Sequence, residues 1–482
     1  MANEKSKKAK VLTSVAAVAL AASMLIGGGT YAYLQGETND VVNSFDTNEV
    51  TVDLTETTGS NYEIIPGTTQ AKDPKVTVNA TVDAYVYVTV DDATDGLVTY
   101  TMADGWTLLE GYENVYYREV TASDAAQEFD VLAGNQVSYD AALTNTDMVD
   151  AEGNLKDGID LTFKAYAVQK MPFGNPVDAY TCKNGEIFAA DTETAVEAVK
   201  AGKAVVLADN VSIPATDLNA AGNADINANG KELTITGNTF VQVGNGESFK
   251  VSNGTVNWAN KNGNAISVRA GEGSIITFDN VETDMNGSSI LVDYGTEAAT
   301  VNVIDSTIYT TAYYCISTNA SNPDTGSGVV INVENSTLTA ADPNGDCTAI
   351  LMNVPGTLTI TGSEINAGRQ AVIVRCGTAV IKDSVLNNSL KYTSANWAIY
   401  DEKGWGSGNE VPVAVLVVGD RSTAYPYSAV CTVENTELNF GAETTRKPVY
   451  AAAYNGYTTT VNGVSADMVT TSSDANGVTV NP

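Results

Sequence analysis

The residues that could carry out chemistry in this chain are acidic for the most part. Its 482 residues include 58 Asp and Glu, 25 Lys and Arg, five Cys and no His. Without an imidazole, Ser-His-Asp and Cys-His mechanisms are excluded, and a common ligand of zinc and haem is missing. Carboxylate chemistry remains. A polysaccharide lyase would need an acidic calcium cluster with an Arg or Lys base, and a hydrolase would need two facing carboxylates.

Candidates for contacting a carbohydrate lie in the C-terminal part. Trp397, Tyr400 and Trp405 form an aromatic-rich stretch, and aromatic rings can stack on sugar rings. Alternatively, these rings pack their own loop against the rest of the protein. Arg375 follows an apolar strand and is a candidate for binding an acidic sugar, with a solvated surface arginine as the alternative. No residue is predicted to be catalytic.

Metal ligands are sparse. The turn DDATDG at 91–96 could bind calcium through its Asp residues, yet it lacks the ligand set of a complete calcium loop. The five cysteines show no CxxC spacing, and their odd number leaves at least one unpaired within the chain. We interpret them as small apolar core residues. The sequence therefore predicts no cofactor, with calcium as the remaining alternative.

The N-terminus has the pattern of an export signal. Four lysines within the first ten residues precede an apolar run at 11–26, and three glycines end that run. Its sixteen residues are short for a bilayer span, which takes about 20. We predict a signal peptide at 1–32, cleaved between Ala32 and Tyr33, with no transmembrane span after processing. An uncleaved anchor is the alternative.

Two further regions follow. From about 45 to 169, apolar and polar residues alternate in short segments such as 75–79, and turns rich in Asp and Gly separate them. This pattern predicts an antiparallel β-sandwich. Prolines at 172 and 176 then end the last strand, so we place the sandwich at 33–170 and a linker at 171–190.

After a helical pattern at 192–201, the sequence repeats itself. Six stretches share an apolar anchor, followed two positions later by Asn, Asp or Gly, and the anchors are 25, 30, 27, 21 and 52 residues apart. The spacing predicts a parallel β-solenoid at 191–482, with an insertion at about 388–412 in the longest interval. Anchors should stack inside, and the Asn, Asp or Gly should occupy a left-handed turn, with a calcium ladder as the alternative. The anchors are Phe278, Val303, Val333, Ile360, Ile381 and Val433, and the turn residues are Asn280, Asp305, Asn335, Gly362, Asp383 and Asn435.

An acidic column on the outside of the solenoid would indicate an enzyme. Asp279, Glu334 and Glu434 occupy equivalent outward positions of the repeat. The repeats between them carry an apolar, a hydroxyl or a basic residue at that position, so no acidic column is sustained. This absence argues against catalysis in the solenoid.

Residues 1 to about 170 resemble the TasA/camelysin family. The family's signal end is matched by GGTYA at 28–32, its mature start by NSF at 43–45, and its iiPG element by IIPG at 64–67. NE at 48–49 departs from the glycine that the family usually has there. The resemblance implies a jelly-roll-like sandwich, processing by a SipW-type signal peptidase, and a place on the cell surface or in the biofilm matrix of a Gram-positive bacterium. It also implies fibre formation by donor-strand exchange.

Residues 190 to about 480 are similar to the pectate-lyase-like right-handed parallel β-helix superfamily, which includes lyases, hydrolases, adhesins and inert stalks. The expected fold is therefore all-β, a sandwich followed by a right-handed parallel β-helix. The resemblance spans the helical pattern and the repeats, and it leaves the function of this part open.

Together these features predict a secreted structural protein of the cell surface or extracellular matrix. Its β-helix would project as an adhesive or carbohydrate-binding module, and its partners would be further copies, matrix or fibre proteins, or a polysaccharide. The alternative is a polysaccharide-active β-helix enzyme, a lyase or a hydrolase. A segment at 33–47 could pair with a neighbouring subunit, with a monomer as the alternative. The net charge of −33 excludes nucleic acid as a partner.

Overall fold

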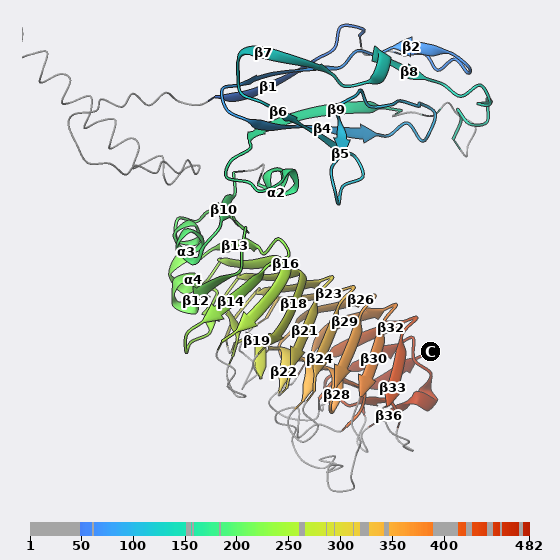
Figure 1. Cartoon of the computed structure of the whole chain (residues 1–482). Helices are drawn as coiled ribbons and strands as arrows, with labels where there is room; N and C mark the ends of the chain where they lie inside the picture. The colour runs from blue at the N-terminus through green and yellow to red at the C-terminus, as the bar shows by residue number, and fades with distance from the viewer. Residues whose placement is uncertain are drawn as a thin grey trace, which may run out of the picture. The chain divides into compact units, whose positions relative to one another are not determined.

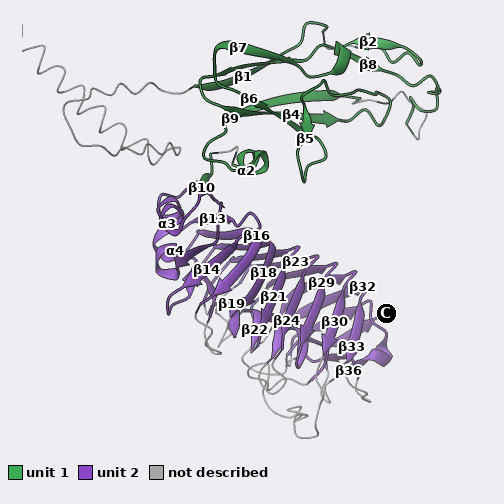
Figure 2. Ribbon diagram, viewed as in Figure 1, with its two compact units in different colours: residues 1–188 green, residues 189–482 purple. Residues whose placement is uncertain are grey.

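The chain forms two compact units, residues 1–188 and 189–482 (Figure 2). Each unit has a core of its own. The computed structural model describes residues 49–59, 62–150, 156, 159–182, 185–259, 266–285, 287–293, 295–311, 313–318, 327–341, 347–388, 413–420, 427–440, 447–453, 456–471 and 476–482.

The first unit is a β-sandwich of two antiparallel sheets (Figure 1). One sheet has the order β1-β3-β7 and the other β5-β6-β4-β9, while β2 and β8 form a separate pair. Inward valines such as Val78 of β3 and Val88 of β4 are fully buried in one shared core. The strands are β1 Val50–Thr55, β2 Thr69–Ala71, β3 Lys75–Ala80, β4 Ala84–Asp92, β5 Thr107–Leu108, β6 Val115–Val120, β7 Ser123–Asp130, β8 Gln136–Ser138 and β9 Leu161–Gln169, with a 3-10 turn at Ala133–Asn135.

The predicted linker at 171–190 contains a helix that packs on the sandwich. Helix α2, Pro176–Thr181, begins at the N-cap Asn175, whose side chain accepts a hydrogen bond from the backbone of Asp178. Tyr180 of α2 lies 5.0 Å from the ring of Tyr87, and the Tyr87 hydroxyl donates to the Pro176 carbonyl at 2.7 Å. The helix therefore belongs to the first unit, and its aromatic contacts cover the outer face of β4.

The second unit is a parallel β-helix (Figure 1). It opens with β10 Ile187–Ala189, α3 Thr192–Lys200, β11 Val205–Leu207, β12 Val211–Pro214, α4 Ala215–Ala221, β13 Ala224–Asn227 and β14 Glu232–Thr236. The pattern at 192–201 is thus a helix, with Asp191 as N-cap. Among the described residues, no helix is long and apolar enough to cross a membrane.

Each full coil contributes a strand before a bend, a strand after it and a strand in a third face, as β20, β21 and β22 do. The first two faces contain β16 Ser248–Trp258, β18 Ile275–Met285, β20 Thr300–Ile304, β21 Thr307–Thr310, β23 Val329–Glu334, β24 Thr337–Ala340, β26 Gly356–Thr361, β27 Glu364–Ala367, β29 Gly377–Lys382, β30 Val385–Asn388, β32 Ala429–Glu434, β33 Glu437–Phe440, β35 Thr459–Asn462 and β37 Val478–Asn481. The third face contains β15 Val241–Gln242, β17 Val268–Ala270, β19 Ser288–Val292, β22 Tyr314–Thr318, β25 Thr348–Met352, β28 Gln370–Val374, β31 Leu416–Val418, β34 Val449–Ala451 and β36 Val469–Thr471, and Ala466–Met468 forms a 3-10 turn.

The six predicted anchors stack in direct register. Each one pairs with the next from Phe278 to Val433, and all are buried. Ile381 pairs directly with Val433, so the 52-residue interval is a single coil. In the third-face strand β22, Ser317 and Thr318 interrupt the apolar run, and both are buried.

The residue after each anchor strand makes a left-handed bend, as the pattern predicts. The six predicted turn residues have φ between 42° and 59°. Two of their side chains bond to a residue of the neighbouring coil: Asn280 donates to Asn253 at 3.0 Å, and Asn435 donates to Asp383 at 2.7 Å. Amide donors occupy the Asn253 and Asp383 oxygens, so at these two positions the side chains support the turns.

A buried serine follows four of the six bends and ties neighbouring coils together; these serines are Ser306, Ser336, Ser363 and Ser384. The Ser336 hydroxyl accepts from the Ser306 backbone at 3.0 Å and donates to the Glu334 carbonyl at 2.6 Å. Ser336 in turn donates its own backbone N–H to the Ser363 hydroxyl at 3.0 Å. Each hydroxyl thus satisfies backbone groups that the bend removes from the sheet ladder.

Replacing Ser336 by Ala should lower the free energy of unfolding by about 1–3 kcal/mol, because the buried Ser306 N–H loses its acceptor. Equilibrium urea unfolding followed by circular dichroism measures the change. Thr337→Ala, one residue further and facing outward, is the matched control and should change stability by less than about 0.5 kcal/mol. Equal effects of the two substitutions would show that the hydroxyl has no such role.

Candidate functional site

Most of the site residues predicted from the sequence lie outside the described residues. This holds for the cleavage positions Ala32 and Tyr33, and for the aromatic candidates Trp397, Tyr400 and Trp405 of the insertion. Their predicted roles stay predictions.

Arg375 lies inside the β-helix. It directly follows β28, its side chain is fully buried, and its Nε lies 3.1 Å from Oδ2 of Asp420, which is equally buried. The guanidinium therefore serves an internal ion pair. The sequence pattern placed it at the end of a strand but could not show that an aspartate beyond the insertion would meet it there.

Two further charged residues, Arg269 and Asp95 of the turn at 91–96, also have partners within the protein. Arg269 pairs with Asp293 and lies 5.6 Å from the ring of Phe240. In the turn at 91–96, Asp95 pairs with Lys156. Among the described residues, no group of three or more Cys, Asp or Glu is placed to hold a metal ion.

The five cysteines are buried and form no disulfide with one another. Burial raises the pKa of Cys182 to about 12, with acidic neighbours adding to the effect. Burial alone raises the pKa of Cys431 to about 12. These two thiols are therefore protonated at neutral pH, in keeping with the interpretation as core residues.

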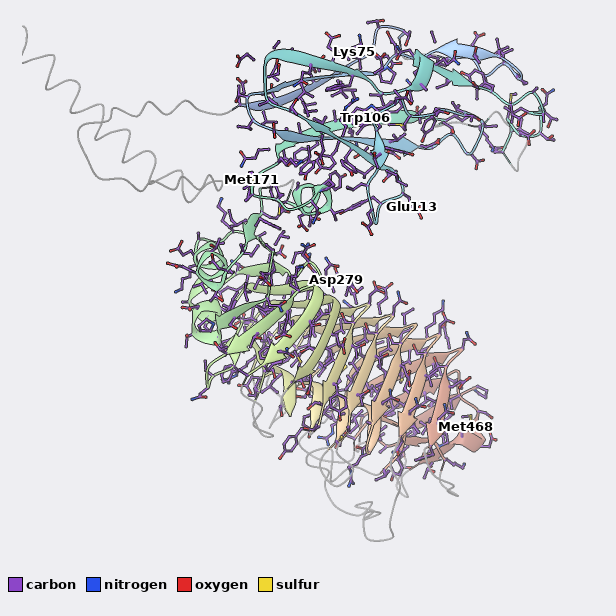
Figure 3. All side chains as sticks on the ribbon, viewed as in Figure 1. Lys75, Trp106, Glu113, Met171, Asp279 and Met468 are labelled. Carbon is purple, nitrogen blue, oxygen red and sulfur yellow. The ribbon has the colours of Figure 1, made fainter. Side chains whose placement is uncertain are left out.

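The outward column that contains Asp279, labelled in Figure 3, is not acidic throughout. Its members alternate between acidic and other types, as the sequence analysis expected. In register they are Asp279, Ile304, Glu334, Thr361, Lys382 and Glu434.

A groove of about 410 Å³ follows the bend between the first two faces, beside β16, β18 and β21. Glu282 of β18 and Asp305 of the next coil both line it, and both are exposed. Because Glu282 pairs with Thr307, Asp305 sits one strand away and two residues back. Asp305 is itself the bend residue, so the two acidic residues come from adjacent coils at the same bend.

The two carboxylates of this groove are available to a ligand. Within the described part of the chain, neither makes a hydrogen bond or an ion pair. A similar groove of about 500 Å³ lies further along the bend, with Asp383 and Glu437. There the Asp383 carboxylate accepts a hydrogen bond from Asn435 at 2.7 Å, so that pair is partly occupied.

Polar and aromatic groups surround the first groove. Thr255, Thr307 and Asn253 contribute hydroxyl and amide groups to its lining. Tyr309 follows Thr307 by two residues on β21 and therefore faces the same side, with 37% of its surface exposed. Hydroxyl partners beside a ring face are the groups that recognise sugars.

The sequence analysis did not find this pair of carboxylates. It compared residues at equal positions of the repeat, whereas Glu282 and Asp305 are diagonal neighbours on opposite sides of the bend. The signal was present, because Asp305 is a predicted turn residue and Glu282 lies two residues after the equivalent Asn280. A search across adjacent columns would have brought them together.

No protein-family model and no curated protein matches the chain. Solved structures that it resembles include the catalytic domain of GH87 α-1,3-glucanase in complex with nigerose, with 10% identity, TM-score 0.33, and 90% of this chain and 98% of that one covered. Another is the catalytic unit of the thermostable GH87 α-1,3-glucanase from Streptomyces thermodiastaticus strain HF3-3, with 11% identity, TM-score 0.30, and 90% and 95% covered. Similarity of this degree transfers neither substrate nor catalytic residues to this chain.

These findings correct the main functional prediction. The sequence favoured a structural or adhesive surface protein, whereas these solved structures are catalytic domains of polysaccharide hydrolases. The prediction took the missing acidic column as evidence against a site and did not compare adjacent columns, where Glu282 and Asp305 lie.

Replacing Arg375 by Ala should destabilise the protein by about 3–5 kcal/mol, because Asp420 would stay buried without its cation. Arg269→Ala removes an arginine that is 37% exposed and should cost less than about 1 kcal/mol. Thermal and urea unfolding of the two variants measure the difference. A stable Arg375→Ala variant would show that the ion pair does not hold this part of the β-helix.

Proposed function

We propose that the β-helix unit is a polysaccharide-active enzyme, a glycoside hydrolase that cleaves a neutral glycan in the groove beside Glu282 and Asp305. One observation carries the proposal: two exposed, uncommitted carboxylates from adjacent coils line the same groove. Hydrolysis of a glycosidic bond needs two carboxyl groups and no imidazole or metal. The residue types of the chain meet that requirement.

The reaction assigns one role to each carboxyl group. One group, protonated, donates its proton to the glycosidic oxygen as the bond to the anomeric carbon breaks. The other, ionised, takes a proton from the water that attacks the anomeric carbon. A separation of about 6.5–9.5 Å between carboxyl groups leaves room for that water and inverts the anomeric configuration.

The substrate is a neutral glycan because of the charge of the protein. The groove is lined by acidic and uncharged residues, and the whole chain carries a net charge of −33. An anionic polysaccharide such as pectin or alginate would be repelled. Thr255, Thr307 and Asn253 would bind sugar hydroxyls, and Tyr309 would support the ring of a neighbouring sugar.

The first unit has its own proposal: it is the exported, TasA/camelysin-like sandwich that the N-terminal resemblance implies, with a jelly-roll connection. Its two antiparallel sheets with one core support this. The signal peptide, the SipW-type processing and an extracellular location rest on the sequence at 1–45. An extracellular location would bring a glycan-cleaving β-helix to its substrate.

The N-terminus of the exported protein tests the location. The mature protein secreted by a Gram-positive host that expresses a SipW-type peptidase should begin at Tyr33, as read by intact-mass and N-terminal peptide analysis. An Ala32→Trp variant should be secreted poorly or remain unprocessed, because the position before the cut requires a small residue. Secreted protein that still begins at Met1 would contradict the signal peptide.

An activity assay tests whether the β-helix unit is a glycoside hydrolase. The protein should release reducing ends from at least one polysaccharide in a panel of α-1,3-, α-1,4-, β-1,3- and β-1,4-glucans, xylan, mannan and chitin, and none from pectin or alginate. Glu282→Gln and Asp305→Asn should each lower the rate by about 10²–10⁴-fold. The matched control, Asp383→Asn with Glu437→Gln in the second groove, should leave the rate unchanged.

Three results would contradict this function. No turnover on any neutral glycan would remove it, and so would full activity of both groove variants. Loss of activity in the control variant alone would move the site to the second groove. Circular dichroism and unfolding curves confirm that each variant is folded.

A further inference from the structure

The first unit contains a cavity of its own, of about 710 Å³, which the proposed function does not use. It opens between the ends of the two sheets, where β1 and the start of β9 approach the segment before β3. Leu54, Ile64, Val98 and Phe163 give it apolar walls. Its volume lies within the range of about 300–1,000 Å³ that is usual for small-molecule sites.

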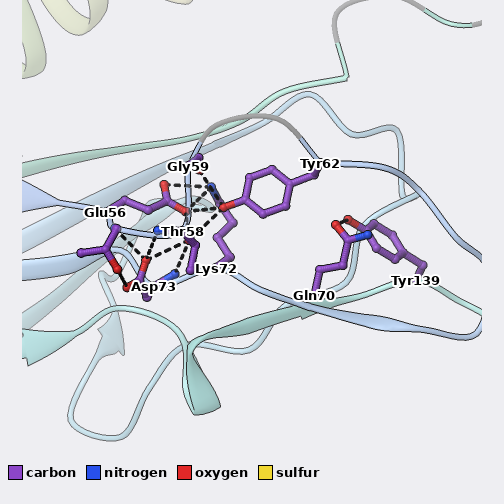
Figure 4. A network of polar contacts seen from close by, with 9 residues as sticks. Glu56, Thr58, Gly59, Tyr62, Gln70, Lys72, Asp73 and Tyr139 are labelled. Carbon is purple, nitrogen blue, oxygen red and sulfur yellow. Dashed lines mark hydrogen bonds and ion pairs between the residues drawn. The ribbon is translucent and has the colours of Figure 1, made fainter.

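A buried cation lines this cavity. Lys72 is only 8% exposed at its side chain, and its ammonium donates to both carboxylate oxygens of Glu56 at 3.0 and 3.1 Å (Figure 4). The Tyr62 hydroxyl donates to the same carboxylate at 2.6 Å. Burial and the bond to Glu56 raise the pKa of Tyr62 to about 12, so this hydroxyl stays a donor at neutral pH.

The ammonium of Lys72 retains a donor that the described residues do not use. Lysine has three N–H donors, and in the described part of the chain Glu56 is the acceptor for this ammonium. The same nitrogen lies 4.8 Å from the ring of Tyr62 and 5.6 Å from the ring of Phe163. The cavity therefore combines an available hydrogen-bond donor with two aromatic rings.

Stability alone does not explain a buried ion pair of this kind. Burying a Lys and a Glu requires both to lose water, and apolar residues of similar size are often as stable or more so. Here the pair stands on the wall of a cavity and not in the packed core. Its charges compensate each other, so the site favours a neutral ligand that offers hydroxyl or ring oxygens as acceptors.

We propose that this cavity is a second carbohydrate site, which binds the end of a neutral oligosaccharide. The assignment of the ligand class rests on the proposed function, because a glycan-cleaving protein meets such chain ends as substrate and product. Lys72 donates to a sugar oxygen, and the rings of Tyr62 and Phe163 contact the apolar face of the sugar. The site would hold a glycan chain to the protein independently of cleavage.

The test uses the full chain with Glu282→Gln and Asp305→Asn, so that a glycan is not cleaved and the groove is altered. Glucotrioses of α-1,3, α-1,4, β-1,3 and β-1,4 linkage are titrated by calorimetry. At least one should bind, and Val98→Trp, which fills the cavity, should weaken its binding at least tenfold. Leu108→Trp, on an exposed side chain outside the cavity, is the matched control and should bind as before.

A second variant removes the two charged groups and keeps the volume of the cavity. Glu56→Gln with Lys72→Met should also weaken the triose at least tenfold, with unfolding curves to confirm that the sandwich is intact. No binding of any triose, or binding that Val98→Trp leaves unchanged, would overturn the proposal. Binding of an added peptide of alternating Val and Thr without any triose would assign the cavity to a polypeptide and overturn it as well.

The two proposals fail separately. Triose binding without hydrolysis by the unmodified chain would remove the enzyme and keep the cavity site. Hydrolysis with triose binding that is insensitive to Val98→Trp would remove the cavity site and keep the enzyme.

Discussion

The in-register stacking of one coil on the next is the constraint on which the second unit depends. Every anchor from Phe278 to Val433 pairs with its equivalent in the neighbouring coil, and no charged residue interrupts that inner column. Stacking in register requires each coil to bend at the same point. The left-handed residues make that bend, and the buried hydroxyls such as Ser336 satisfy the backbone groups that it exposes.

The same constraint dictates where a site can form. Each coil contributes one residue to each outward column, so successive residues of a column lie about 4.8 Å apart. Two side chains that must act together then come from adjacent coils. At the bend, the last column of the first face lies beside the first column of the second face. Glu282 and Asp305 meet this condition without disturbing the core, because both positions face solvent and tolerate many residue types.

The distinction between buried and exposed positions also explains which features could be predicted from the sequence. The anchors and the turn residues were predictable because burial and positive φ restrict the residue types allowed there. The strand β22 and the helix α2 were not, because Ser317 in one and the tyrosine contacts of the other depend on neighbours distant in sequence. Arg375 shows the same limit, since its partner Asp420 lies beyond the insertion.

The charged groups of the two units have different surroundings. This difference bears on which ligands each unit could bind. In the cavity of the sandwich, Lys72 and Glu56 neutralise each other, so a ligand meets hydrogen-bond donors without a net field. In the groove of the β-helix, Glu282 and Asp305 are both acidic and both exposed to water. An anionic ligand would therefore be repelled by the groove and would gain no net charge attraction in the cavity. A neutral glycan meets neither obstacle, and its hydroxyls match the donors and acceptors of both sites.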